Sequence, residues 1–369
     1  MNAANATPET LLRAAAGHRA AGRIDAAILA YEAALRLRPD LPNSWYNLAM
    51  LQRQAGLFEA ALASYAEALG RGVEGPEEVH LNRGVIFSDD LGRADLAEEA
   101  LGEALRIAPD YLPALLNLGN LHEDRGDRAG AAAAYAKARA LAPDAATPLA
   151  RLLGVSKLSG REDALAAEAR ARIADLRLAA GERAELGYAF AGALDRAGAW
   201  EDAFAAAAAA NGEARRSSGL TYDRKAQERL VDRLIAAFPT TGRDQPGTGG
   251  EAPIFILGMF RSGSTLAEQI LARGEGVATG GELTIVPDLA AGMAGYPEAA
   301  ATASEAEIER LRGLYRQRLV AARGSAAFHT DKRPDNFLHV GLIKRLFPAA
   351  KIVHTVRDPA DVAVSLFLD

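Results

Sequence analysis

Residues 254–271 read IFILGMFRSGSTLAEQIL: an apolar run, a glycine-flanked turn and an amphipathic run follow one another. This order predicts a strand, an anion-binding loop and a helix. Gly258 and Gly263 let the backbone turn tightly. A helix that starts just after the turn directs its unpaired N–H groups and the positive end of its dipole at the loop. An anionic group is therefore expected to bind there.

The loop follows the spacing of the Walker loop of nucleoside triphosphatases, with one replacement. Residues 258–265 fit G-x-x-x-x-G-S-T, but Ser264 stands where those enzymes carry the lysine that meets the β- and γ-phosphates. A nucleotide-hydrolysing protein is thus the weaker alternative. Arg261 supplies a cation instead, and its planar guanidinium suits a phosphate or sulfate. We expect a phosphate ester bound without magnesium; an ordinary strand-to-helix turn with a surface arginine is the other interpretation.

A second stretch, KIVHTVRDPADVAVSLFL at 351–368, predicts a strand followed by a helix. Asp358 suits the N-cap of that helix and Pro359 suits its first turn. Ligands of open α/β sheets bind outside the carboxyl ends of the strands, so Arg357 is expected to face the same crevice as the first loop. Local structure accounts for neither Arg357 nor Ser365.

From about residue 253 onward the chain resembles the sulfotransferases that use 3′-phosphoadenosine 5′-phosphosulfate (PAPS), and most of all the tyrosylprotein sulfotransferases. In that family an Arg-Ser-Gly-Thr-Thr loop holds the 5′-phosphosulfate. An Arg-Asp strand end and a serine on the next helix, matched here by Arg357 and Ser365, hold the 3′-phosphate. The residues that match the loop are Arg261, Ser262, Gly263, Ser264 and Thr265. The resemblance implies a P-loop-like, three-layer α/β domain with PAPS as donor and no metal.

The family also has a Gly-Glu element, whose glutamate is the general base, and a lysine on a later strand end. GGEL at 280–283 supplies Glu282, and TDKRPDNF at 330–337 supplies Lys332. An acceptor hydroxyl, with a pKa near ~10 for tyrosine, must lose its proton during attack. The resemblance thus implies catalytic roles for Glu282, Lys332 and Arg261. The residues by themselves leave open a helix N-terminal acid and a solvated lysine.

Two features depart from the family. Phe260 stands where the residue before the loop arginine is usually proline, and the family's domain continues beyond the length present here. The resemblance therefore implies that residues 253–369 are the N-terminal portion of such a domain, apparently truncated at the C-terminus. The alternative function is an adaptor that binds proteins and whose incomplete catalytic part does not turn over.

Before this domain, glycines at 22, 56, 92 and 126 are spaced 34, 36 and 34 residues apart. This is the period of the tetratricopeptide repeat (TPR). Alanines five and twelve residues after each glycine, with a tyrosine or leucine nine after, share one helix face because they are separated by steps of four and three. These residues are Ala27, Tyr31, Ala34, Ala61, Tyr65, Ala68, Ala97, Leu101, Ala104, Ala131, Tyr135 and Ala138.

The pattern is clear over about 9–145 and fades beyond it, with Gly160 and Gly198 continuing the glycine rhythm. Terminal repeats are atypical because they close the stack. TTGRDQPGTGGEAP at 240–253 is typical of a linker. We expect a TPR α-solenoid at 1–215, a helix and linker at 216–252 and the sulfotransferase-like domain at 253–369.

Composition adds limits. The formal net charge of −6 and the sequence pI of 5.7 argue against nucleic acid as the main partner. Cysteine is absent, so the chain has no disulfide or thiolate metal site. No apolar run approaches 18 residues and the start does not resemble a signal peptide, so we expect a cytoplasmic protein without a membrane span. Oligomeric state is left open.

The expected function joins the two parts. The concave face of a repeat solenoid typically binds extended peptides. We therefore expect sulfuryl transfer from PAPS to a hydroxyl, with tyrosine in a protein as the favoured acceptor. Glycan, lipid and small-metabolite hydroxyls remain open.

Overall fold

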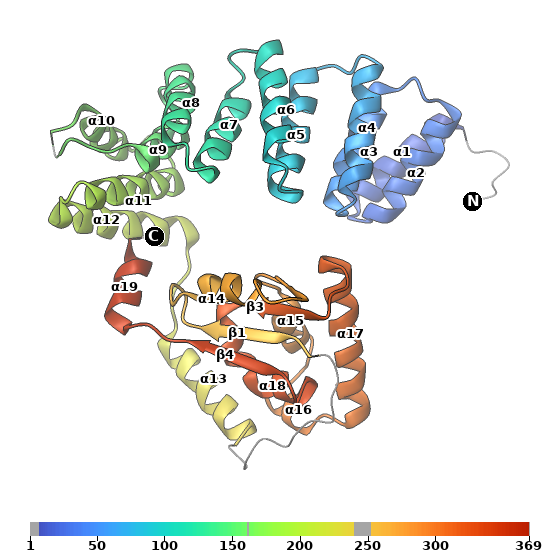
Figure 1. The fold of residues 1–369 in the computed structure, drawn as a ribbon, viewed down its shortest axis with the longest axis vertical. Helices are drawn as coiled ribbons and strands as arrows, with labels where there is room; N and C mark the ends of the chain where they lie inside the picture. The colour runs from blue at the N-terminus through green and yellow to red at the C-terminus, as the bar shows by residue number, and fades with distance from the viewer. Residues whose placement is uncertain (1–6, 161, 240–251, 369) are drawn as a thin grey trace. The chain divides into compact units, whose positions relative to one another are not determined.

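The computed structural model describes residues 7–160, 162–239 and 252–368. The chain divides into two compact units, Met1–Ser217 and Ser218–Asp369. The predicted combination of a helical repeat unit and a parallel α/β unit is confirmed (Figure 1). The linker predicted at 240–253 lies outside the described residues, apart from Ala252 and Pro253.

The first unit consists of helix pairs. The first helices of the pairs are α1 (Pro8–Ala20), α3 (Pro42–Gln54), α5 (Pro76–Val85), α7 (Leu112–Asp124), α9 (Ala146–Val155) and α11 (Ala180–Arg196). The second helices are α2 (Ile24–Leu37), α4 (Phe58–Gly70), α6 (Ala94–Ile107), α8 (Arg128–Leu141), α10 (Ala164–Ile173) and α12 (Trp200–Ser218). Helix α5 continues into a π-helical turn, η2 (Ile86–Asp90).

The repeat glycines produce the turn inside each pair. Their φ angles are positive, at 69° for Gly22, 75° for Gly56, 63° for Gly92 and 77° for Gly126. Glycine adopts this left-handed region without a steric penalty, so each first helix ends there and the chain reverses into the second. The predicted alanines five and twelve residues later are all fully buried, and the residues nine later are at most 5% exposed. The periodic helix face is therefore the packed one.

One contact shows how closely the helices approach. A Cβ atom on Gly119 of α7 would lie 2.2 Å from the ring of Tyr135 on α8. The Tyr135 hydroxyl reaches past this glycine and donates to Asn120 Oδ1 at 2.8 Å and to Glu123 Oε2 at 3.1 Å. The missing side chain at Gly119 thus provides the space that the aromatic ring fills.

The second unit contains a parallel sheet in the order β2-β3-β1-β4. Its strands are β1 (Ile254–Gly258), β2 (Val277–Ala278), β3 (Phe328–Lys332) and β4 (Lys351–Thr355). Its helices are α13 (Arg224–Ala237), α14 (Ser264–Leu271), α15 (Ile285–Ala291), α16 (Glu298–Thr302), α17 (Glu305–Arg323), the 3₁₀ turn η3 (Pro334–His339), α18 (Val340–Leu346) and α19 (Pro359–Phe367).

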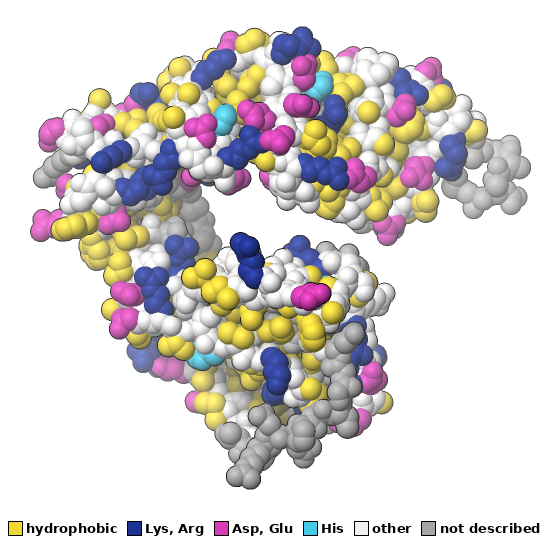
Figure 2. Space-filling view, viewed as in Figure 1, with side chains coloured by type: hydrophobic (Ala, Val, Ile, Leu, Met, Phe, Trp, Pro, Cys, Tyr) yellow, Lys and Arg dark blue, Asp and Glu magenta, His cyan; other side chains and the backbone are white. Residues whose placement is uncertain are grey.

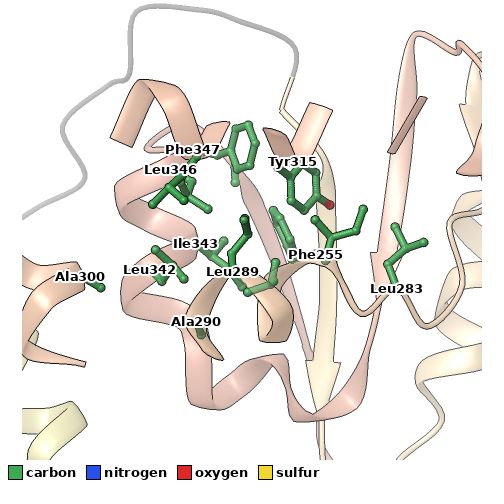
Figure 3. Packing of buried hydrophobic residues seen from close by; sticks show 14 of the residues in the cluster. Phe255, Leu283, Leu289, Ala290, Ala300, Tyr315, Leu342, Ile343, Leu346 and Phe347 are labelled. Atoms are coloured by element: carbon green, nitrogen blue, oxygen red, sulfur yellow. The ribbon is translucent and has the colours of Figure 1, made fainter. Parts of the chain in front are cut away.

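The core of this unit lies between the sheet and helices α15, α17 and α18 (Figure 3). Phe255 of β1 has its ring centroid 6.1 Å from that of Tyr315 and 6.2 Å from that of Phe347. Burying one such side chain stabilises a fold by about 1.5–3 kcal/mol. Ile256, which points to the opposite face by strand alternation, is also fully buried, and α14 packs on β1 and β3.

The topology brings four connections to one edge of the sheet. Because all strands are parallel, the segments that follow β1, β2, β3 and β4 leave from the same carboxyl edge. The predicted strand and helix at 351–368 are β4 and α19, and Asp358 caps α19 by accepting from the Ala360 N–H at 2.8 Å. Among the described residues, no helix is both long and apolar enough to cross a bilayer.

Candidate active site

The predicted anion-binding loop connects β1 to α14. Gly263 has φ 92° and stands at the N-cap of α14, where no side chain caps the helix. The first N–H groups of the helix therefore face the loop without a side-chain acceptor, as an anion site requires. Arg261 has φ 64° and is the one described non-glycine residue with positive φ. The tight turn thus depends on an arginine in an unfavourable backbone conformation, a feature that accompanies functional loops.

Gly258 permits a close approach between the ends of β1 and β4. A Cβ atom there would lie 2.4 Å from the Thr355 carbonyl oxygen. The Ser262 hydroxyl is held in the same place: it donates to the Met259 carbonyl oxygen at 2.5 Å and lies 2.7 Å from the Thr355 hydroxyl. The structure therefore directs the Ser262 hydroxyl towards the strand ends, where it fixes the loop.

The second predicted motif meets the first. The Arg261 Nε donates to the Ser365 Oγ of α19 at 2.9 Å. The Arg357 Nη1, from the segment after β4, donates to the Arg261 carbonyl oxygen at 3.3 Å, and its Nε lies 3.7 Å from Asp361 Oδ2. Two guanidinium groups and a hydroxyl are thereby gathered beside the N-terminus of α14.

The predicted base and the predicted lysine form an ion pair. The Lys332 Nζ, at the end of β3, donates to Glu282 Oε1 at 2.6 Å. The lysine side chain is only 7% exposed, whereas that of Glu282 is 51% exposed. A nearly buried ammonium is stabilised by such a partner, and the exposed carboxylate remains accessible to an incoming group.

A cavity of about 550 Å³ collects these residues. It is lined by Arg261, Ser262, Gly263, Ser264, Thr265, Glu282, Arg357 and Ser365, together with Phe260, Pro334 and Leu366. Lys332 lies outside the lining and reaches the cavity through its bond to Glu282. The structure therefore brings all nine predicted site residues to one place, from segments up to 104 positions apart.

A buried carboxylate that the sequence analysis did not identify connects the parts of this site. Glu268 of α14 is 3% exposed. Its Oε1 accepts from the Gly281 N–H at 2.9 Å and from the Thr330 hydroxyl at 2.5 Å. The Gly280 N–H in turn donates to the Thr330 Oγ1 at 2.9 Å, and a Cβ atom on Gly280 would lie 1.8 Å from the Thr330 carbonyl oxygen. These contacts hold the Gly-Gly-Glu element against β3.

One sequence feature could have identified Glu268. It lies four residues after Ser264, so the two side chains share a helix face, and both are buried. A carboxylate on the inward face of a short helix that leaves an anion-binding loop is unusual, because a buried charge requires partners. The partners come from segments distant in sequence.

A second buried network lies behind Lys332. Asp331 is fully buried and accepts from the Tyr315 hydroxyl at 2.7 Å and from the Asn336 Nδ2 at 3.0 Å. Burial raises the pKa of Asp331 to about 7, while both hydrogen bonds act in the opposite direction. The network fixes the end of β3, from which Lys332 extends.

No group of three or more histidine, cysteine, aspartate or glutamate side chains arranged to hold a metal ion occurs in the described ranges. Histidines 329 and 339 are placed near the motifs without lining the cavity. The His339 Nδ1 lies 2.8 Å from the Tyr296 hydroxyl, and burial lowers the pKa of His339.

Comparison with protein families matches both parts of the chain. Residues 253–369 match the model described as the Sulfotransferase family. Residues 18–56 match a model described as TPR repeat, and residues 42–71 and 77–111 match a model described as Tetratricopeptide repeat.

Individual relatives are more distant. An uncharacterized protein of Aquifex aeolicus (strain VF5) is 33% identical over 197 residues, which is 50% of this chain and 26% of the relative. The match thus spans about a quarter of the length of that curated relative.

Solved structures of repeat proteins are also similar to the chain. A tetratricopeptide repeat protein from Parabacteroides merdae ATCC 43184 is 19% identical, covers 61% of this chain and 97% of its own, and gives a TM-score of 0.41. A thermophilic TPR protein of Thermus thermophilus is 24% identical, covers 55% and 98%, and gives 0.34. The fold and the family matches together show that the chain joins tetratricopeptide repeats to a domain of the sulfotransferase family.

Proposed function

We propose that the protein transfers a sulfuryl group from PAPS to a hydroxyl acceptor, with tyrosine in a polypeptide as the favoured acceptor. The observation that carries this proposal is the cavity of about 550 Å³, in which both anion-binding motifs and Glu282 lie together. Phosphoryl hydrolysis has less support because Ser264 occupies the position of the Walker lysine.

The site residues fit the donor at two ends. The uncapped start of α14, with Ser264, Thr265 and Arg261, offers N–H groups, hydroxyls and a guanidinium to the 5′-phosphosulfate. Arg357 and Ser365 offer a second guanidinium and a hydroxyl to the 3′-phosphate. The bond from Arg261 to Ser365 keeps the two groups adjacent.

PAPS, when bound, supplies a sulfuryl group attached to a phosphate that leaves readily. Glu282 accepts the proton from the acceptor hydroxyl, since its carboxylate is half exposed and lines the cavity. Lys332 and Arg261 provide positive charge for the oxygen that the leaving phosphate retains, an effect worth roughly 3–4 kcal/mol for each donor in comparable sites. The Lys332–Glu282 bond of 2.6 Å keeps the base ionised before an acceptor arrives.

The surroundings of Glu282 support an aromatic acceptor. Phe260, Pro334 and Leu366 line the same cavity, and Phe260 and Leu366 are each 43% exposed. Exposed apolar side chains beside a carboxylate suit a phenol, which has an apolar ring and a polar hydroxyl. Phe260, which replaces the family's proline, thus contributes a surface for the acceptor ring. The repeats, a fold that commonly binds peptides, support a polypeptide substrate.

A transfer assay tests this proposal. The chain is incubated with PAPS that carries ³⁵S, and with a tyrosine peptide, its tyrosine-to-phenylalanine counterpart or its tyrosine-to-serine counterpart. We expect label in the tyrosine peptide and none in the other two, and Glu282→Ala should abolish the label. Label in the serine peptide would contradict the tyrosine preference. Absence of label from every hydroxyl acceptor, with PAPS bound, would contradict transfer itself.

A further inference from the structure

Five equivalent residues form a row along the first helices of the repeats. Each stands two positions after an apolar residue that begins the repeat pattern, namely Leu11, Trp45, Leu81, Leu115 and Leu149. The five residues are Arg13, Asn47, Arg83, Asn117 and Arg151, which alternate strictly between arginine and asparagine at steps of 34, 36, 34 and 34. We call them the Arg/Asn row.

Hydrogen bonds between the helices place neighbouring members side by side. The Arg19 Nη1 of α1 donates to the Asn47 Oδ1 of α3 at 3.0 Å. The Tyr46 hydroxyl of α3 donates to the Glu78 Oε1 of α5 at 2.6 Å, and the Asn82 Nδ2 of α5 donates to the Tyr46 hydroxyl at 3.2 Å. Helices α5 and α7 are also in contact. Equivalent positions on adjacent helices therefore line up across the repeat unit.

Arginines elsewhere in the repeats are matched by carboxylates. Figure 2 shows Lys and Arg side chains interspersed with Asp and Glu on the visible face of the repeat unit. Examples are Arg53 with Asp90, Arg93 with Glu59, and Arg125 with Asp95 and Glu98.

The arginines of the row differ from these. Arg13, Arg83 and Arg151 form no ion pair with any residue that the structure describes. Among the residues three or four positions from them on the same helices, Glu9 is the one carboxylate, and it pairs with Arg38 at 2.8 Å. A chain with a formal net charge of −6 thus presents a row of unmatched positive charge.

Arg83, at the centre of the row, is the clearest case. Its side chain is half-buried, and its Nε is buried without a hydrogen-bond partner. Burial lowers the pKa of its guanidinium. A desolvated, unpaired cation is costly, and an anionic partner would recover that cost. An acidic ligand is therefore expected to gain most at this position.

The asparagines are held in one common orientation. The Asn47 Nδ2 donates to the Asn43 carbonyl oxygen at 2.7 Å, and the Asn117 Nδ2 donates to the Pro113 carbonyl oxygen at 2.9 Å. A carboxamide has two N–H donors, so each side chain keeps a second donor for a ligand. A donor at regular intervals suits the carbonyl oxygens of an extended peptide backbone.

We propose that the Arg/Asn row binds an extended acidic segment of a partner polypeptide. Adjacent packed helices lie roughly 8–10 Å apart, so arginines two helices apart are separated by roughly 16–20 Å. An extended chain advances about 3.3 Å per residue, so the row fits acidic side chains spaced about five or six residues apart. This inference rests on the protein-binding part of the proposed function and does not require sulfuryl transfer.

Fluorescence anisotropy with the full chain tests the proposal. The probe is a labelled peptide of neutral residues that carries three glutamates about six residues apart. Two comparison peptides carry the glutamates next to one another, or glutamine in their place. We expect the spaced peptide to bind at least about tenfold more tightly than the glutamine peptide, and its affinity to fall with added salt.

Variants assign the binding to the row. Arg83→Gln should weaken the spaced peptide about tenfold, because it removes a partly desolvated charge-assisted contact. Arg13→Gln and Arg151→Gln, at exposed positions, should each weaken it about two- to fivefold. Arg36→Gln is the matched control, since Arg36 is an exposed arginine on the second helix α2 without a described ion pair.

Arg83→Gln is not expected to unfold the protein, because it removes an unpaired charge; thermal unfolding checks this. Equal binding of the spaced and clustered peptides would overturn the proposed register. Unchanged affinity in Arg83→Gln and in the Arg13→Gln, Arg151→Gln double variant would overturn the site. Tighter binding of a single-stranded oligonucleotide, lost in the same variants, would replace the acidic peptide with a nucleic acid and overturn the proposal.

Discussion

The Arg261 side chain donates to the Ser365 hydroxyl at 2.9 Å, although 104 positions separate the two residues. One belongs to the loop after β1 and the other to α19, so the bond connects the two anion-binding motifs. The bond from Arg357 to the Arg261 carbonyl oxygen, at 3.3 Å, adds a second connection. A ligand with an anionic group at each end would contact a single connected unit.

Loss of either arginine should weaken binding of 3′-phosphoadenosine 5′-phosphate. Hydrogen bonds to charged groups contribute about 1.5–3 kcal/mol, so Arg261→Ala and Arg357→Ala should each raise the dissociation constant about tenfold or more. Isothermal titration calorimetry measures this change. Arg273→Ala is the matched control, because Arg273 is an exposed arginine outside the cavity lining. If both variants bind like the parent, the assignment of the anion site is wrong.

Loss of Glu282 should separate chemistry from binding. Glu282→Ala removes the proton acceptor, so the rate of transfer should fall roughly 10²–10⁴-fold while affinity for the 3′,5′-diphosphate changes less than about threefold. Single-turnover transfer and calorimetry on the same preparation measure the two quantities. A parallel loss of affinity would instead assign Glu282 a structural role, for example through its bond to Lys332.

Glu268 should act on Glu282 through its position. Glu268→Ala removes the acceptor for the Gly281 N–H and the Thr330 hydroxyl, so the Gly-Gly-Glu element should loosen and transfer should fall at least about tenfold. Glu268→Gln retains a carbonyl oxygen that can accept both bonds and should restore most of the rate. Hydrogen exchange at 279–283 should rise in Glu268→Ala and stay near the parent value in Glu268→Gln. Equal activity in both variants would exclude this positioning role.

Asp331 should make the second unit less stable as pH rises. Its pKa is about 7 in the folded protein and about 3.9 in an unfolded chain, so between these values the folded state binds more protons. Raising the pH through this window therefore favours unfolding, with a slope of up to about 1.4 kcal/mol per pH unit. Asp331→Asn should abolish this dependence while still accepting from the Tyr315 hydroxyl.

Urea titrations followed by pulse proteolysis at pH 5 and pH 8 measure this effect for the second unit. The parent should lose stability at the higher pH relative to the variant. If parent and Asp331→Asn show the same pH dependence, Asp331 is already ionised in the fold and the burial argument is wrong.

The sequence was sufficient where the structure depends on short repeats or local rules. Glycines such as Gly22 and Gly56 end first helices with positive φ, and Ala27 and Ala61 pack where the period places them. Asp358 caps α19 as its position before Pro359 indicates. These features depend on φ/ψ preferences and on helix period, which neighbouring residues determine.

Contacts between distant segments were not predictable in the same way. Glu268 belongs to an amphipathic helix, where a glutamate usually faces solvent, yet the β2–β3 register brings Gly281 and Thr330 to it. The Lys332–Glu282 ion pair and the inward Ser262 hydroxyl likewise depend on how the strand ends meet. Such pairings arise from sheet order and packing, which a single sequence does not specify.

The most direct test of the account is a calorimetric titration of the 369-residue chain with 3′-phosphoadenosine 5′-phosphate, with ATP as the comparison ligand and without magnesium. The account predicts selective binding of the 3′,5′-diphosphate, because the loop at Arg261 and the pair Arg357 and Ser365 would each hold one phosphate. Absence of binding to a folded protein, or equal binding of ATP, would contradict it.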